Sequence, residues 1–79
     1  MKLPRDLSGD ALAARLADLG YAITRQRGDH LRLTTSQGGV HLVTIPRHDP
    51  LKVGTLSGIL ADVAAHFELT REELLNRLF

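Results

Sequence analysis

The residues best suited to chemistry lie in one short stretch near the middle of the chain. Residues 25–32 read Arg-Gln-Arg-Gly-Asp-His-Leu-Arg, so a histidine follows a turn glycine and has three arginines close to it in sequence. A neutral imidazole can accept a proton near pH 7 and return it, which makes His30 the candidate acid–base residue. An exposed strand histidine without a role is also common, and the residues by themselves leave both interpretations open.

Basic residues are concentrated around this histidine. The whole chain has a formal net charge of +1, whereas residues 25–52 carry five basic side chains against two aspartates. Such asymmetry is typical of a polyanion-binding centre, although a solvated strand surface of mixed charge would look similar. The candidate phosphate-binding residues are Arg25, Arg27, Arg32, Arg47 and Lys52.

Length and composition narrow the class of protein. Seventy-nine residues, of which 43% are hydrophobic, predict one small folded domain over residues 1–79. The chain has no cysteine and no apolar run near the ~20 residues of a membrane span, so we expect a cytoplasmic protein without disulfides or a membrane anchor. No histidine or carboxylate pair has zinc-site spacing, and no glycine-rich loop opens a helix, so we expect neither a metal nor a cofactor.

Three helices are predicted from apolar periodicity and capping residues. Ser8 is the expected N-cap of a helix near residues 9–19. A longer helix should begin after Thr55 as its N-cap and carry an apolar stripe as far as Phe67. A capping-box pattern then predicts a short third helix near residues 71–78.

Three strands are predicted between the first two helices, at residues 21–26, 30–35 and 40–45. Pro46 should end the third strand because proline cannot donate to a ladder. Short connections make the strands antiparallel, and the apolar stripes of both long helices should cover one face of the sheet. The predicted fold is therefore α+β with two layers, in the order α-β-β-β-α with a short extra C-terminal helix.

The alternation of the strands places the candidate histidine on the open face of the sheet. Leu33 should face the helices, whereas His30 and its neighbours at even positions should face solvent. To put Ile23 on the same face as Leu33, parity favours a three-residue hairpin loop over residues 27–29, with Gln26 across from His30.

The chain resembles the HicA toxins of bacterial HicA–HicB toxin–antitoxin pairs. The likeness rests on Gly28-Asp29-His30, then Val43-Thr44-Ile45-Pro46, then Gly54-Thr55-Leu56, in this order and spacing. It implies a fold similar to a double-stranded RNA-binding domain. It also implies an mRNA interferase, a small ribonuclease that is held inactive by a HicB antitoxin.

The resemblance maps the family's catalytic histidine onto His30, with Gly28 and Asp29 in the supporting turn. The family usually has a serine where this chain has Asp29. An acidic side chain beside a phosphate site should weaken anion binding or change the behaviour of His30, so we expect reduced or altered activity. We also expect a HicB-like partner to cover His30.

The reaction implied by the resemblance is metal-independent transphosphorylation of mRNA. His30 would remove the proton from a ribose 2′-OH, and the basic residues would hold the phosphate. The general acid is left open between His48 and a second use of His30. Two alternatives also stay open: a non-catalytic RNA-binding module, and a protein-interaction domain that docks through its open sheet face or an edge strand.

Overall fold

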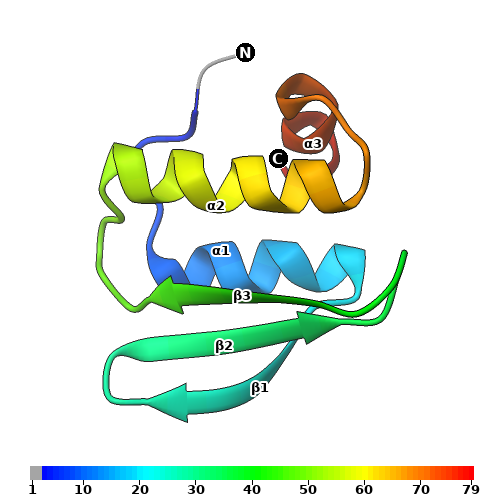
Figure 1. Ribbon diagram of the computed structural model, residues 1–79. Helices are drawn as coiled ribbons and strands as arrows, with labels where there is room; N and C mark the ends of the chain where they lie inside the picture. The colour runs from blue at the N-terminus through cyan, green and yellow to red at the C-terminus, as the bar shows by residue number, and fades with distance from the viewer. Residues whose placement is uncertain (1–2) are drawn as a thin grey trace.

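The computed structural model describes residues 3–79; Met1 and Lys2 of the expected domain lie outside the described residues. Along the chain the elements are α1 (Gly9–Leu16), the 3-10 turn η1 (Ala17–Leu19), β1 (Ala22–Arg27), β2 (His30–Thr35), β3 (His41–Pro46), α2 (Val53–His66) and α3 (Arg71–Leu78) (Figure 1). This is the predicted order, so the α+β expectation is confirmed.

The caps that the sequence predicted are present at two helices. The Ser8 hydroxyl accepts a hydrogen bond from the Ala11 N–H at 3.0 Å, which satisfies one of the free amides of the first turn of α1. At α3, Thr70 and Glu73 form a reciprocal capping box. After η1 the chain turns at Gly20, whose φ of 82° lies in the left-handed region that glycine adopts without strain.

The predicted start of the second helix is wrong. Helix α2 begins at Val53, its N-cap is Lys52, and no side chain caps it. The chain is fixed just before this point, because the Leu51 side chain is buried and its N–H donates to the Leu7 carbonyl at 2.8 Å. The helix therefore starts directly after this anchor and takes Thr55 into its first turn.

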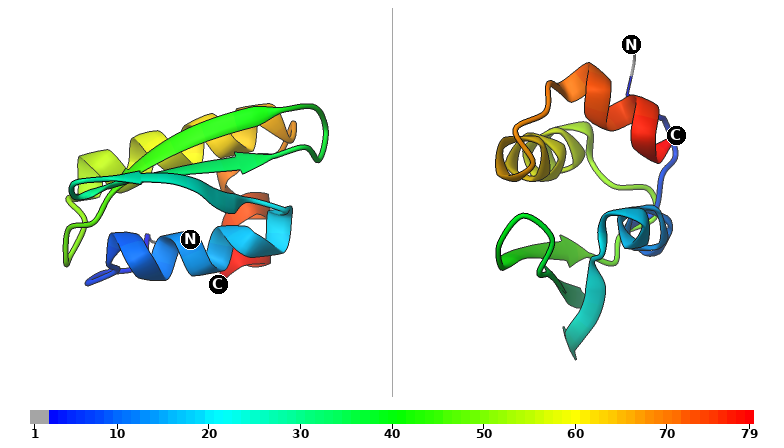
Figure 2. Two further views of the ribbon diagram at one scale, coloured as in Figure 1. Left: turned by 90° about the horizontal axis from the view of Figure 1, so that it is seen from below. Right: turned by 90° about the vertical axis from the view of Figure 1, so that its right-hand side faces the viewer.

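The three strands form one antiparallel sheet in the order β1-β2-β3. The three helices lie on one side of this sheet, and β1 extends beyond the helical layer (Figure 2). The strand side chains that face the helices are buried, namely Leu31, Leu33, Val43 and Ile45. Two layers with one open sheet face are thus confirmed. None of the helices within residues 3–79 is long and apolar enough to cross a membrane.

The hairpin between β1 and β2 differs from the prediction. Arg27, not Gln26, lies across from His30, and the turn contains only Gly28 and Asp29. Gly28 has a φ of 58°, as expected for the first position of a tight two-residue turn. The predicted three-residue loop is therefore one residue too long.

A β-bulge explains the error. Ile23 pairs with Leu33 as parity required, but the next pair joins Arg25 to Arg32, so Thr24 is an extra residue in β1. An extra residue reverses which positions of a strand face the core. The bulge thereby places both arginines of β1 on the open face, the face that carries His30 and Arg32.

Candidate functional site

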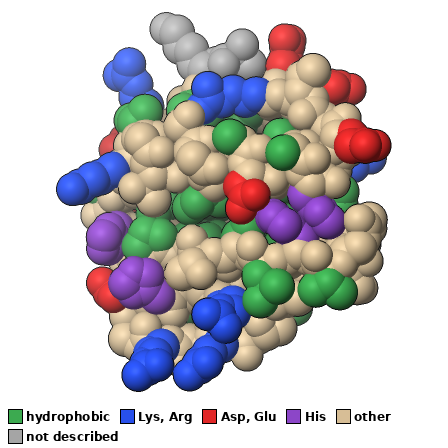
Figure 3. All heavy atoms as spheres, viewed as in Figure 1, with side chains coloured by type: hydrophobic (Ala, Val, Ile, Leu, Met, Phe, Trp, Pro, Cys, Tyr) green, Lys and Arg blue, Asp and Glu red, His purple; other side chains and the backbone are tan. Residues whose placement is uncertain are grey.

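The open face of the sheet has a hollow of about 380 Å³ beside the β1–β2 turn. We call it the basic hollow. Its lining residues are Arg25, Arg27, His30, Arg32 and Thr44. Figure 3 shows a group of Lys and Arg side chains at the bottom of the molecule, with histidine side chains above them toward the left edge. The structure thus brings the candidate histidine and three of the five candidate basic residues to one site.

Strand pairing arranges the hollow in two rows. Arg25 lies across from Arg32, which in turn pairs with Thr44, whereas Arg27 lies across from His30. Because the two rows are two residues apart along each strand, they are separated by roughly 7 Å. One row therefore offers two guanidinium groups and a hydroxyl, and the other offers one guanidinium group and the imidazole.

His30 is exposed and has one ring nitrogen engaged. Its Nδ1 lies 3.0 Å from Oδ1 of Asp29, and 58% of its side chain is accessible. The other carboxylate oxygen of Asp29 lies 3.6 Å from Nε2 of His48. The carboxylate of Asp29 is therefore located between two imidazole rings.

Arg47 occupies a different place from the one that the charge pattern suggested. Its Nε and Nη2 donate to the two carboxylate oxygens of Asp10 at 2.9 and 3.1 Å. This hydrogen bonding, together with the charge of Asp10, raises the pKa of Arg47 further above its ordinary value. Its side chain joins the loop after β3 to the first turn of α1 and does not line the basic hollow.

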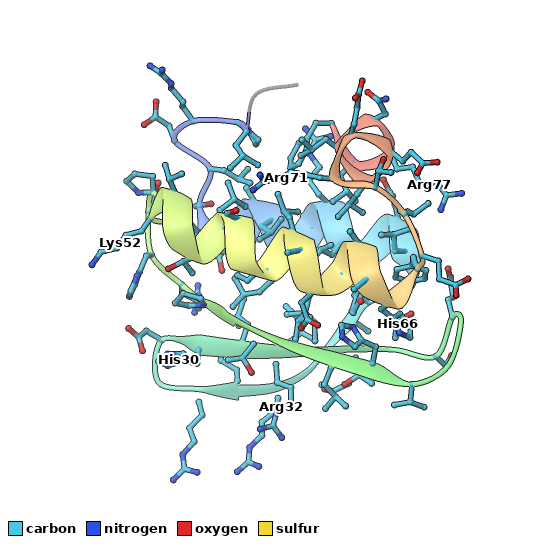
Figure 4. All side chains as sticks on the ribbon, turned by 45° about the horizontal axis from the view of Figure 1, so that its top comes forward. His30, Arg32, Lys52, His66, Arg71 and Arg77 are labelled. Atoms are coloured by element: carbon cyan, nitrogen blue, oxygen red, sulfur yellow. The ribbon has the colours of Figure 1, made fainter. Side chains whose placement is uncertain are left out.

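Lys52 also lies outside the basic hollow. Figure 4 shows it at the start of α2, at the same end of the molecule as His30, with its side chain extending outward. Arg32 points away from the helical layer in the same view. Lys52 could therefore contact only the part of a long substrate that extends beyond the hollow.

A second polar group lies at the other end of the sheet. We call Tyr21, His41, Asp62 and His66 the distal cluster. The Tyr21 hydroxyl lies 2.7 Å from Nδ1 of His41, and Nε2 of His41 lies 3.3 Å from Oδ1 of Asp62. The rings of His41 and His66 stack with centroids 4.4 Å apart. Burial, and secondarily the charge of Asp62, raises the pKa of Tyr21 to about 12.

Thr44 was missed as a site residue. The prediction that Val43 and Ile45 face the helices already places Thr44 on the open face, so alternation could have identified it. In contrast, unbroken alternation would have turned Arg25 and Arg27 toward the helices. Their place in the hollow depends on the bulge.

The fold and the hollow together place the protein in a class: it is a small α+β domain whose open sheet face is basic and carries a histidine. A family model described as HicA toxin of bacterial toxin–antitoxin matches residues 9–64, from α1 through most of α2. The chain belongs to this HicA family and is thus a toxin of a toxin–antitoxin system, which implies an antitoxin partner. No curated protein and no solved structure matches the chain.

Proposed function

We propose that this toxin is a metal-independent mRNA endoribonuclease and that His30 is its general base. Membership of the HicA family supports the proposal. The observation that carries it is the basic hollow, in which an exposed imidazole shares one open site with three arginines. A site that must hold a polyanion and move a proton needs these two kinds of side chain together.

The reaction is an internal transphosphorylation. His30 takes the proton of a ribose 2′-OH, and the 2′-oxygen attacks the adjacent phosphorus. The bond from phosphorus to the 5′-oxygen of the next nucleotide breaks, so one product ends in a 2′,3′-cyclic phosphate and the other in a 5′-hydroxyl. Arginine side chains beside the phosphate offset the negative charge that develops in the transition state.

The two rows of the hollow suit neighbouring phosphates of one strand. The row of Arg27 and His30 would hold the reacting phosphate, and the row of Arg25 and Arg32 would hold the next one. The separation of roughly 7 Å between rows is comparable with the distance between successive phosphates. Arg47 is already paired with Asp10, and Lys52 lies outside the hollow, so both contribute at most at the periphery.

The activity is tested with purified protein and RNA in the presence of EDTA. We expect cleavage that leaves 2′,3′-cyclic phosphate and 5′-hydroxyl ends. His30→Ala should lower the rate about 10²–10⁴-fold, the contribution typical of one acid–base group. Arg77→Ala on α3 is the matched surface control, since Arg77 lies at the opposite end of the molecule (Figure 4). A folded His30→Ala variant that cuts at the parental rate would refute the assignment.

The antitoxin should cover the same hollow. We propose a HicB-like partner that places an acidic or obstructing surface over His30, because a toxin is silenced most directly by excluding its substrate. Alkylation of the exposed His30 imidazole should be fast in the free toxin and slow in the complex. Equal labelling in both states would contradict this mode of inhibition.

If the purified toxin binds RNA but does not cut it, the protein is a non-catalytic RNA-binding module instead.

A further inference from the structure

The turn residue before His30 contacts two imidazoles. Oδ1 of Asp29 lies 3.0 Å from Nδ1 of His30, and Oδ2 lies 3.6 Å from Nε2 of His48. Asp29 is itself 63% accessible in its side chain, so a substrate can reach it from solvent. Neither Asp29 nor His48 lines the basic hollow, and both lie beside it next to His30. Figure 3 shows histidine side chains next to an acidic side chain at the left edge of the molecule, directly above the basic side chains.

The contact with Asp29 orients His30. An ionised carboxylate accepts hydrogen bonds and donates none, so the Asp29 oxygen 3.0 Å from Nδ1 favours the tautomer that carries its proton on that nitrogen. In the neutral ring this leaves Nε2 with the free lone pair. Among residues 3–79 no hydrogen-bond partner of this Nε2 is present, so it is free to accept the proton of a 2′-OH. Fixing the tautomer through the second nitrogen is the way in which carboxylates assist histidine bases.

The backbone of His48 is held firmly beside this turn. The Arg47 N–H donates to the Asp29 carbonyl at 2.6 Å, and the Gly9 N–H donates to the His48 carbonyl at 2.9 Å. Side-chain pairing of Arg47 with Asp10 adds a further link to α1. A Cβ on Gly9 would lie only 2.1 Å from the Pro46 carbonyl oxygen, so glycine is required for this close approach.

We propose that His48 is the general acid of the cleavage reaction and that Asp29 is the positioning residue that holds both imidazoles beside the reacting phosphate. This inference rests on the proposed ribonuclease function and makes it more specific. The two-proton reaction needs a second proton-transfer group near the base, and His48 is an imidazole on a fixed loop that lies near the same carboxylate as His30.

The protons balance over the two rings. The reaction requires His30 with one ring proton and His48 with two. Nε2 of His30 takes the 2′-OH proton as the bond between the 2′-oxygen and phosphorus forms. Nδ1 of His48 gives its proton to the 5′-oxygen as the bond from phosphorus to that oxygen breaks. Exchange with water then restores both rings.

This role reverses the expectation for the residue that replaces the family's usual serine. The sequence suggested that Asp29 weakens the site because it repels phosphate. The structure places its carboxylate against two imidazoles, so its removal should impair the proton transfers. Asp29→Ser, which restores the usual serine, should therefore slow the toxin rather than activate it.

The general acid is tested with a substrate whose leaving group needs no proton. In RNA with a bridging sulfur at the 5′ position, the thiolate leaves unassisted. His48→Ala and His48→Gln should cut ordinary RNA about 10²–10⁴-fold more slowly than the parent. Both should cut the sulfur-bridged substrate within about tenfold of the parent, whereas His30→Ala should lose activity on both substrates.

The outcomes separate this inference from the proposed function. Suppose that the parent cuts RNA, but the His48 variants either lose equal activity on both substrates or lose no activity on ordinary RNA. His48 is then not the general acid, and the ribonuclease assignment stands. If the parent cuts neither substrate in any RNA tried, the proposed function fails and this inference fails with it. Thermal melts of both His48 variants establish that they are folded.

The positioning role of Asp29 has a readout that needs no RNA. Ring ¹⁵N spectra, recorded at a pH at which the His30 imidazole is neutral, report which nitrogen carries the proton. The proton should be on Nδ1 in the parent and mostly on Nε2 in Asp29→Asn and Asp29→Ser. These variants should lower kcat at least about tenfold with little change in KM, and Asp29→Glu should recover part of the loss. Asp18→Asn, on the exposed η1 turn, is the matched control. An unchanged tautomer, or a kcat that rises in Asp29→Ser, would overturn the role.

Discussion

The basic hollow and the distal cluster both contain histidines on or beside the same sheet, but they use the imidazole differently. In the distal cluster both nitrogens of His41 are engaged, its ring stacks on His66, and 18% of its side chain is accessible. In the hollow one nitrogen of His30 is engaged, and 58% of its side chain is accessible. Figure 4 shows His30 and His66 toward opposite ends of the molecule.

The difference distinguishes a histidine suited to a structural role from one suited to react with a substrate. A ring whose two nitrogens are both bonded and whose faces are packed can stabilise the fold, but it cannot reach a substrate. A ring with one nitrogen oriented and the other free can accept a proton from a bound molecule. Residue type alone does not make this distinction, since His30 and His41 both lie at the starts of strands.

The largest expected effect on RNA binding comes from removing the arginines of the hollow. Arg25, Arg27 and Arg32 changed together to Ala should weaken RNA binding by about 10²-fold or more, because three charge-assisted contacts are lost. The slope of log affinity against log salt should fall by about 2, since each phosphate contact to a single strand contributes about 0.7. Filter binding at several salt concentrations measures both. Arg77→Ala should change neither, and an unaltered slope in the triple variant would exclude the hollow as the phosphate site.

The next largest effect is expected for His41→Ala, which should lower stability without changing the cleavage rate. His41→Ala leaves the buried hydroxyl of Tyr21 without its partner and should lower the free energy of unfolding by about 1–3 kcal/mol. Its cleavage rate, measured where it is folded, should equal that of the parent. His30→Ala should show the opposite pattern in urea denaturation and in the RNA assay. The comparison breaks down if His41→Ala is as inactive as His30→Ala.

The distal cluster should also resist alkaline titration. Tyr21 is the one tyrosine of the sequence, so phenolate absorbance reports on it alone. Its pKa is raised to about 12 in the fold, against about 10 in an unfolded chain. The fold therefore favours the protonated phenol, and this contribution to stability is full below pH 10 and is lost as the pH rises to about 12. A folded-state midpoint near 10 would contradict the packing described for Tyr21.

The smallest effect is expected for deletion of Thr24. Removing the extra residue restores regular pairing after Ile23 and leaves Arg25 across from Arg32, on the open face. RNA affinity should therefore stay within about threefold of the parent, with a small loss of stability from the hydrogen bond between Thr24 and Thr34. A loss of affinity as large as that of the triple arginine variant would show that the bulge itself shapes the hollow.

Much of the fold could be predicted because its signals act over short distances in sequence. The cap at Ser8 and the capping box of Thr70 and Glu73 each join residues three positions apart. The alternation of β2 follows from the period of a strand, so the burial of Leu31 and Leu33 and the exposure of His30 were determined by the sequence itself. These features need no knowledge of what packs against them.

The tertiary structure alone decided how the site is completed. Whether Arg25 and Arg27 face the helices or solvent depends on a single bulge. The same residues could pair with or without that bulge, and the bulge reverses which positions of the strand face the core. The pairing of Arg47 with Asp10 joins residues 37 positions apart, and it removes from the hollow a residue that its charge had suggested. Long-range contacts of this kind arise from the docking of a loop on a helix, which no local pattern encodes.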